Sequence, residues 1–250
     1  MNLHNSKGDR ALEKLEQLYE GKAKKVFKTS EPEIYWIEYK DDATAFNGEK
    51  KGEIAGKGTM NNEISSIFLS FLKEKGVNNH FVKKISTTEQ LVQQVVIIPI
   101  EVVVRNIAAG SLAKRLGWEE GKKLTKPIVE YYFKNDELSD PFINNDHIDI
   151  LGLCTEEELA IIRSQALKIN DILKEFLLGK DILLVDFKLE FGNTPGGQIL
   201  LADEISPDTC RFWDAQTKEK LDKDRFRRDL GNVEGAYQEI LKRIGGSVGV

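Results

Sequence analysis

The clearest alternation of hydrophobic and charged positions lies in residues 183–192, which read Leu-Leu-Val-Asp-Phe-Lys-Leu-Glu-Phe-Gly. Asp186, Lys188 and Glu190 occupy every second position, and hydrophobic residues stand between them. Because side chains alternate across a strand, the three charged groups share one face. A Pro-Gly-Gly loop and a second apolar run follow, so residues 183–211 predict a β-hairpin and a polar turn that leaves it.

Three other stretches carry hydrophobic residues three or four positions apart, which predicts amphipathic helices with one face in the core. The first covers residues 60–76, where a glycine stands at the expected C-terminal cap. The second is the longest, because a Thr-Glu-Glu-Glu capping box at residues 155–158 opens it and Gly179 ends it. The third lies within residues 221–244.

Strand patterns surround a glycine turn at residues 18–27, continue at residues 34–39 and recur over residues 81–105. Residues 41–62 are rich in Asp, Gly, Lys and Asn, which predicts a long mobile loop of the kind that usually has a function. Residues 118–154 are charged and predict irregular structure.

One candidate domain boundary lies near residues 85–97. A lysine- and glycine-rich half gives way there to strands that carry the charged faces. We therefore expect an N-terminal lobe of residues 1–92 and a C-terminal lobe of residues 93–250. A chain of 250 residues has ample core for this division.

Composition limits the classes of function. With 41 acidic and 36 basic residues the chain is mildly acidic, which argues against bulk nucleic-acid binding but leaves a local basic pocket open. No apolar run approaches the ~20 residues that span a membrane. Cys154 and Cys210 lack metal-binding spacing and are most simply reduced thiols, so we expect a cytoplasmic protein. His4, His80 and His147 are too scattered to predict a metal site.

The predicted hairpin brings two carboxylates together. If its loop is centred on residues 196–197, Glu190 falls opposite Asp203. Facing carboxylates repel each other unless a cation lies between them, and such oxygen ligands suit Mg²⁺. We therefore predict a metal site at Glu190 and Asp203, and we expect that removing one charge leaves the metal-free protein at least as stable. An ordinary solvated hairpin face is the alternative.

A turn near the N-terminus carries candidate phosphate-binding groups. It consists of Gly21, Lys22, Ala23 and Lys24. Glycine lets backbone amides approach a ligand, and the lysines supply positive charge for phosphate oxygens. The spacing is not that of a Walker A loop, and a basic hairpin turn is the alternative.

A second candidate anion site follows the strand patterns. Periodicity places Glu101 and Arg105 on one face, and Ser111 predicts the N-cap of a short helix that ends at Gly117. Free amides and the helix dipole would then face a bound anion, although simple capping is an equal alternative. Together with Arg211, these residues predict a clamp for phosphate or carboxylate.

Spacing alone thus predicts a magnesium–phosphate site and ATP-dependent chemistry, without naming the second substrate. Longer motifs extend the picture. They are Tyr-Glu-Gly-Lys-Ala-Lys-Lys at 19–25, Ala-Thr-Ala-Phe-Asn-Gly at 43–48, Gly-Lys-Gly-x-x-Asn-Asn at 56–62, Pro-x-Glu-Val-Val-Val-Arg-Asn at 99–106, Ala-Gly-Ser-x-x-Lys-Arg-Leu-Gly at 109–117, Leu-Val-Asp-Phe-Lys-Leu-Glu-Phe-Gly at 184–192, Asp-Glu-Ile-Ser-Pro-Asp-Thr-Cys-Arg-x-Trp-Asp at 203–214 and Asp-Lys-Asp-Arg-Phe-Arg-Arg at 222–228. In these motifs, over residues 18–244, the chain closely resembles the SAICAR synthetase family of purine biosynthesis.

That resemblance implies a fold and a reaction. The fold would be α+β, an ATP-grasp-like pair of lobes with antiparallel sheets and with adenine between them, near residues 93–101. The reaction would join L-aspartate to the carboxylate of 5-aminoimidazole-4-carboxyribonucleotide (CAIR) through an acyl phosphate, giving SAICAR, ADP and phosphate. Family habit also implies a homodimer that acts on these small molecules and binds neither nucleic acid nor membrane.

The resemblance also implies a role for each candidate residue. The turn of residues 21–24 would cover the ATP phosphates, and Glu190 and Asp203 would hold Mg²⁺. Asp186 and Lys188 would be the catalytic pair, orienting the imidazole and neutralising developing charge. The substrate-binding set would be Arg105, Ser111, Asp186, Lys188, Asp208 and Arg211.

Functions of two other classes stay open at this point. A small-molecule or lipid kinase of related architecture would release ADP without any need for aspartate. A non-catalytic nucleotide-binding module is disfavoured, because every charged position of the expected site is present.

Overall fold

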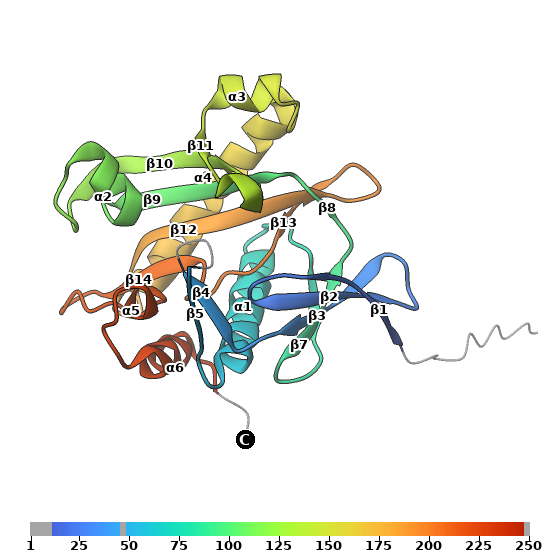
Figure 1. The fold of residues 1–250 in the computed structure, drawn as a ribbon, viewed down its shortest axis with the longest axis horizontal. Helices are drawn as coiled ribbons and strands as arrows, with labels where there is room; N and C mark the ends of the chain where they lie inside the picture. Colours follow the sequence, from blue (N-terminus) through green and yellow to red (C-terminus); the bar gives the residue numbers. More distant parts are fainter. Residues whose placement is uncertain (1–11, 46–48, 248–250) are drawn as a thin grey trace, which may run out of the picture.

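Two antiparallel sheets frame the structure, and a separate β-hairpin lies beside them (Figure 1). The computed structural model describes residues 12–45 and 49–247. The five-stranded sheet has the order β1 (Lys14–Glu20), β2 (Lys24–Thr29), β3 (Ile34–Tyr39), β7 (Glu89–Gln93) and β6 (Phe81–Lys84). The seven-stranded sheet has the order β11 (Phe142–Ile143), β10 (Lys123–Phe133), β9 (Ile100–Ile107), β12 (Ile182–Asn193) and β13 (Ile199–Ala202), and β14 (Cys210–Asp214) and β8 (Val96–Ile97) also pair with β12.

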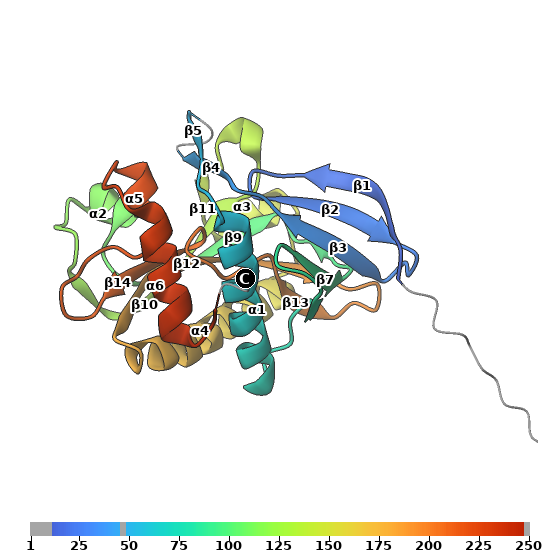
Figure 2. The ribbon, with the colours of Figure 1, turned by 90° about the horizontal axis from the view of Figure 1, so that it is seen from below.

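Helices separate and flank these sheets, so the predicted α+β class is confirmed (Figure 2). The predicted long helix is α4, with the Thr155–Glu158 capping box formed and Gly179 at its end. The helices are α1 (Lys57–Glu74), α2 (Gly110–Leu116), α3 (Asn145–Ile150), α4 (Glu156–Leu178), α5 (Asp224–Arg227) and α6 (Val233–Ile244), with a 3₁₀ turn η2 (Asp136–Leu138). Within the described residues, no helix is long and apolar enough to cross a membrane.

The core lies between the seven-stranded sheet and the helices α1, α4 and α6. On β12 the hydrophobic positions Phe187, Leu189 and Phe191 are each 1% exposed, as the alternating pattern requires. Phe68 of α1 packs against Phe212 of β14 with ring centroids 6.1 Å apart. Burying a side chain of this size stabilises the fold by about 1.5–3 kcal/mol. The core therefore fixes one face of β12, and on the opposite face Lys188 and Glu190 line the cavity described below, whereas Asp186 is buried.

Residues 41–62 do not form the predicted long loop. They contain the hairpin β4 (Asp42–Ala45) and β5 (Lys50–Glu53), and α1 begins at Lys57. The carboxylate of Asp41 accepts from the backbone N–H groups of Gly56 and Gly58, at 3.0 and 2.8 Å, so it holds the start of α1. Residues 46–48 of the motif at 43–48 lie outside the described part, as does His4.

Residues 118–154 are also more regular than predicted. Strand β10 has eleven residues, and the side chain and backbone of Asn144 and His147 form a capping box that opens α3. Charged residues and Pro127 mask the strand in the sequence. In the structure its pairing with β9 shifts register between Lys123 and Ile128, which accommodates a proline without a ladder donor.

Candidate active site

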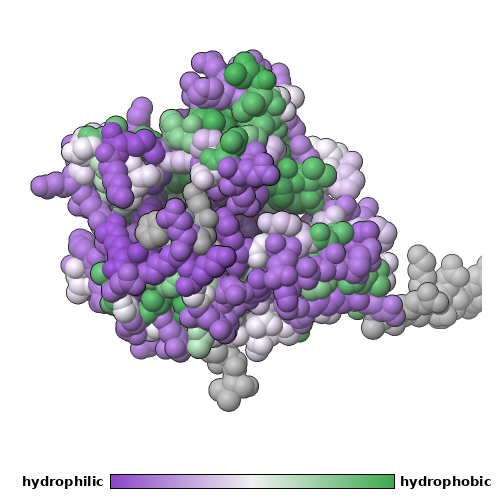
Figure 3. Space-filling model, viewed as in Figure 1, coloured by the Kyte–Doolittle hydropathy of each residue, from purple (hydrophilic) through white to green (hydrophobic). Residues whose placement is uncertain are grey.

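A cavity of about 500 Å³ opens between the two sheets. Its walls come from the β1–β2 turn, from β3 and β7, and from the facing strands β8, β9 and β12. Val26, Val92 and Ile97 line an apolar part, whereas lysines and carboxylates line the rest. Hydrophilic residues surround the hollow at the centre of the face shown in Figure 3. An apolar slot beside a charged wall is suited to a ligand that has both a ring and phosphates.

The predicted turn of residues 21–24 joins β1 to β2 at this cavity. The N–H of Gly21 donates to the C=O of Lys24 at 2.8 Å and closes the turn. The ammonium of Lys24 contacts the carboxylates of Asp203 and Glu204, the second at 3.4 Å. Burial opposes its charge, but these two carboxylates raise the pKa of Lys24 above its ordinary value. Lys24 is therefore a permanent cation inside the cavity.

The middle residues of the turn lie nearer the rim. Lys22 pairs with Asp136 of η2 at 2.8 Å, and both side chains are well exposed. Ala23 lines the cavity, and its C=O accepts from the backbone N–H of Lys40 at 2.8 Å. An exposed ion pair contributes little to stability, so Lys22 can exchange Asp136 for an anionic ligand at small cost.

The register of the predicted hairpin is wrong by one residue. Glu190 pairs with Ala202, and Asp203 lies one residue beyond β13 with a backbone φ of 58°. Glu190 and Asp203 therefore do not face each other directly across the ladder. They are brought together by a lysine between them.

Lys188 is that cation. Its ammonium lies 2.6 Å from Glu190, 3.0 Å from Glu101 and 3.3 Å from Asp203. Lys134 adds a second ammonium 2.9 Å from Glu190. Burial opposes the charge of Lys188, but the carboxylates around it raise its pKa well above the ordinary value. The expectation that removing one carboxylate would relieve repulsion is therefore replaced, because the removal leaves lysines without their counter-charge.

Asp203 is held from both its side chain and its backbone. Burial alone would favour the neutral acid, but Lys24 and Lys188 hold the pKa of Asp203 well below its usual range. Nε2 of His80 lies 3.0 Å from the Asp203 C=O, so the ring nitrogen carries the hydrogen and donates it. Burial, with Lys24 nearby, lowers the pKa of His80 to about 4, so the ring is neutral at neutral pH.

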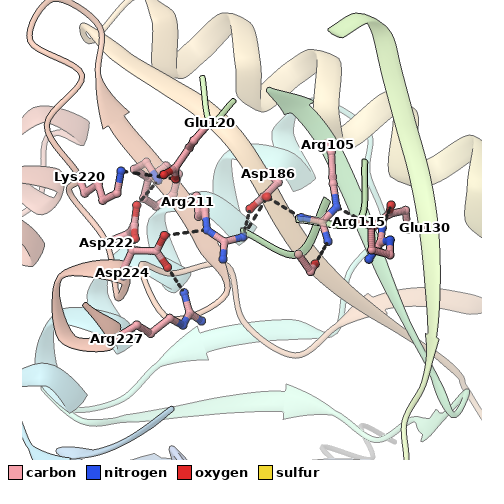
Figure 4. Close-up of polar contacts among 12 residues, drawn as sticks. Arg105, Arg115, Glu120, Glu130, Asp186, Arg211, Lys220, Asp222, Asp224 and Arg227 are labelled. Carbon is pink, nitrogen blue, oxygen red and sulfur yellow. Dashed lines mark hydrogen bonds and ion pairs between the residues drawn. The ribbon is translucent and has the colours of Figure 1, made fainter. Parts of the chain in front are cut away.

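A row of alternating charges crosses β9, β12 and β14 at Asp186, which lies two residues from Lys188 on β12 (Figure 4). The buried guanidinium of Arg105 donates to Glu130 at 2.6 Å and to Asp186 at 2.7 Å. Asp186 also accepts from Arg211 at 3.0 Å, and Arg211 donates to Asp224 at 2.9 Å. The carboxylate of Asp186 thus holds two guanidinium groups together. Charge-assisted contacts of this kind are strong and directional, so the row is preorganised.

Ser111 is not the predicted N-cap. The N-cap of α2 is Ala109, and the hydroxyl of Ser111 accepts from Nη2 of Arg105 at 3.0 Å. Gly110 has a φ of 52°, and a Cβ there would lie 2.5 Å from the Arg211 guanidinium. Glycine is therefore required where Arg211 passes the start of α2. Gly117 ends the helix in the left-handed conformation, as predicted.

Asp208 lines the cavity, but its oxygens are already engaged. It accepts from the fully buried Lys57 at 2.8 Å and from the hydroxyl of Tyr237 at 2.6 Å. The adjacent C=O of Thr209 accepts from the backbone N–H of Lys188 at 2.8 Å. This geometry favours an anchoring role for the turn of residues 206–209, and contact of Asp208 with a substrate stays a prediction.

Sequence reasoning missed five residues that the fold brings to this site. They are Lys57, His80, Lys134, Glu204 and Lys223. Three of these have a signal in the sequence, because the motifs at 56–62, 203–214 and 222–228 contain Lys57, Glu204 and Lys223. For His80 and Lys134 no local pattern marks a function.

Comparison with known proteins identifies the family. A sequence model described as SAICAR synthetase matches residues 17–244. The chain belongs to the SAICAR synthetase family. A relative from Brevibacillus brevis, named phosphoribosylaminoimidazole-succinocarboxamide synthase, is 63% identical over 239 residues, which are 96% of this chain and 100% of that protein. One of the same name from Coprothermobacter proteolyticus is also 63% identical, over 94% of this chain and 99% of its own.

Solved structures agree. The synthase from Ehrlichia chaffeensis has a TM-score of 0.91 at 47% identity, covering 93% of this chain and 99% of its own. A SAICAR synthetase solved in complex with ADP has a TM-score of 0.90 at 52% identity, covering 93% and 98%. With this family comes the reaction: the chain is an ATP-dependent ligase that joins L-aspartate to CAIR in purine biosynthesis.

Proposed function

We propose that this ligation takes place at the cavity between the sheets, and that neighbouring positions of β12 bind different parts of the substrates. The observation that carries the proposal is that alternate positions of β12 take part in two neighbouring charged clusters. Lys188 and Glu190 join Asp203 in one of them, and Asp186 joins Arg105 and Arg211 in the other. The first suits phosphates and a metal, and the second suits a phosphorylated substrate. A single ligand set can therefore extend from one to the other.

Nucleotide binding is assigned to the N-terminal side. The apolar walls at Val26, Val92 and Ile97 would take the adenine, and residues 93–101 border the same slot. Lys22 and Lys24 would then approach the phosphates. The ADP complex of the 52% identical SAICAR synthetase supports a nucleotide site of this kind. We propose accordingly that ATP lies between lobes formed by residues 1–92 and 93–250.

The residues present fit a divalent cation. Glu190 and Asp203 converge on Lys188, and the carboxylate oxygen Oε2 of buried Glu204 has no hydrogen-bond partner among the described residues. Those residues include no group of three or more ligating side chains that could hold a metal alone. Two carboxylates are nevertheless enough for Mg²⁺, which takes its other ligands from phosphates and water. When bound, Mg²⁺ would neutralise phosphate charge during transfer.

The chemistry explains why ATP is needed. A carboxylate is a poor acyl donor because oxide is a poor leaving group. We propose that a CAIR carboxylate oxygen attacks the terminal phosphorus of ATP, releasing ADP and forming an acyl phosphate. The amine of aspartate then attacks the acyl carbon, phosphate leaves, and the nitrogen loses a proton.

The side chains serve this sequence by position and charge. Lys188 would neutralise charge on the transferred phosphoryl group, and Asp186 would orient the imidazole. Arg105, Ser111 and Arg211 would hold the ribose phosphate of CAIR. Because these groups are fixed before the substrates arrive, little reorganisation is needed at the moment of reaction.

Two measurements test this assignment. ADP should appear at full rate only when CAIR, aspartate and magnesium are all present, and comparable release without aspartate would favour a kinase. A CAIR carboxylate labelled with heavy oxygen should deliver one labelled oxygen to the released phosphate. Phosphate without the label would exclude the acyl phosphate.

We also propose a cytoplasmic homodimer. Phe142, Ile150 and Leu151 are each half or more exposed, and hydrophobic side chains gather over α3 in Figure 3. An apolar surface of this kind suits a second copy of the chain. Cys154 and Cys210 are free thiols, in keeping with a reducing compartment. Ile150→Asp should shift the mass in light scattering from dimer to monomer, and an unchanged dimer would place the interface elsewhere.

A further inference from the structure

Lys223 is a buried cation that the proposed site does not yet use. It is 9% exposed, lines the cavity and stands just before α5. Among residues 12–45 and 49–247, its ammonium has no hydrogen-bond acceptor. The nearest carboxylate oxygen is Oδ2 of Asp208, at 3.7 Å. A buried charge without a full partner is costly, so a ligand anion beside it would be strongly favoured.

The neighbouring acids are committed elsewhere. Asp222 accepts from the backbone N–H groups of Phe212 and Asp224, at 2.8 and 2.7 Å. Asp224 accepts from Arg211 at 2.9 Å and from Arg227 at 2.7 Å.

Asp208 accepts one hydrogen bond on each carboxylate oxygen, from Lys57 and from Tyr237. Glu204, the other acid that attracts Lys223, lies 3.4 Å from the ammonium of Lys24. Burial lowers the pKa of Lys223, and the attraction of Asp208 and Glu204 offsets this only in part. The ammonium thus faces the cavity with capacity for another carboxylate.

The place of Lys223 in the fold indicates which substrate supplies that carboxylate. Its backbone N–H donates to Pro207 at 3.1 Å, in the turn whose Thr209 C=O accepts from the backbone N–H of Lys188. Lys223 therefore belongs to the cavity wall that supports Lys188. The phosphates of ATP and CAIR already have cations in the proposed site. L-Aspartate brings two carboxylates, and no residue of the proposed site has yet been assigned to bind them.

We infer that the ammonium of Lys223 binds a carboxylate of L-aspartate and so places its amine for attack. This inference rests on the proposed function and adds a specificity-determining residue to it. It predicts that Lys223 acts after activation of CAIR, because the acyl phosphate forms before the amine is needed.

Hydroxylamine separates the two steps. Its nitrogen attacks an acyl phosphate, forming a hydroxamate and releasing phosphate, and it has no carboxylate to bind. In Lys223→Met, hydroxamate formation from ATP and CAIR should stay within about threefold of wild type. The KM for aspartate should rise about 10- to 100-fold, the scale of a lost charge-assisted hydrogen bond. Lys223→Arg, which keeps a donor and the charge, should recover much of that loss.

The control is Lys242→Met, the same change on an exposed lysine of α6, which should leave both reactions unchanged. Loss of hydroxamate formation in Lys223→Met, or a raised KM for CAIR, would overturn the inference by placing Lys223 on the nucleotide. A lower kcat with an unchanged KM for aspartate would overturn it too. If wild type itself forms no hydroxamate, the acyl phosphate fails instead, and Lys223 is judged by the aspartate KM alone.

Discussion

Glu190→Gln tests the electrostatics of the site most directly. The change keeps the shape of the side chain and removes one charge. Glu190 is 4% exposed and accepts from Lys188 at 2.6 Å and Lys134 at 2.9 Å. Removing one partner of a buried ion pair costs about 3–5 kcal/mol. The expected cost here is smaller, because the amide oxygen still accepts, Lys134 is 42% exposed, and Lys188 keeps Glu101 at 3.0 Å.

We therefore expect a loss of about 2 kcal/mol in the free energy of unfolding. For a chain of this length, that lowers Tm by about 4–8 °C. Thermal melts without magnesium measure this directly. Turnover should fall by roughly 10²–10³-fold, and most of the Tm increase caused by magnesium and ATP should disappear.

The matched control is Glu16→Gln, which removes an exposed carboxylate that also pairs with a lysine, Lys28. It should leave Tm and turnover nearly unchanged, since exposed pairs contribute little. A Glu190→Gln variant as stable as wild type without magnesium would refute the reasoning. Repulsion between carboxylates would then outweigh their attraction to the lysines.

Three further changes test the surrounding network. Arg105→Lys keeps the charge but loses the two-pronged geometry, so the KM for CAIR should rise while that for ATP changes little; a rise for ATP alone would contradict the assignment. Lys57→Met leaves buried Asp208 without its closest cation and should lower the denaturant midpoint, whereas an unchanged midpoint would mean that the pair contributes nothing net. Burial raises the pKa of Asp224, but Arg211 outweighs this and lowers the pKa to about 2, below the value in the unfolded chain. The ionised Asp224 therefore stabilises the fold above pH ~4, and this stabilisation is lost as the pH falls towards 2. Melts of Asp224→Asn should show a smaller loss over that range, and an equal loss would contradict the pairing.

Local patterns were enough to predict the hairpin, the long helix and the three charged positions of β12. Local patterns were not enough to predict the register of the hairpin, because the register depends on the loop between the strands. Thr194 donates its N–H to the C=O of Gln198 at 2.9 Å, so the loop is centred on Gly196 alone. A Gly-Gly pair does not reveal which of the two lies at the centre, and a one-residue difference moves Asp203 off the ladder.

Several cations of the site were missed for another reason. Lys134 meets Glu190 across 56 positions of the chain, and Lys57 meets Asp208 across 151. Such pairs have no short-range periodicity, and only the folded arrangement brings them together. The sequence thus predicts which groups one strand presents, whereas the counter-charges that balance them come from other elements.

Strand β12 also fixes the distances between three charged groups. Asp186, Lys188 and Glu190 are two residues apart, so successive groups are separated by about 6.7 Å and the outer two by about 13 Å. Substitutions can change the side chain at each of these positions, but they cannot change the spacing between the positions. Deleting one residue within the strand would turn the charged side chains on one side of the deletion toward the core. An enzyme engineered for a longer or shorter substrate would therefore need changes in the loops and helices that face β12, because the spacing along the strand stays fixed.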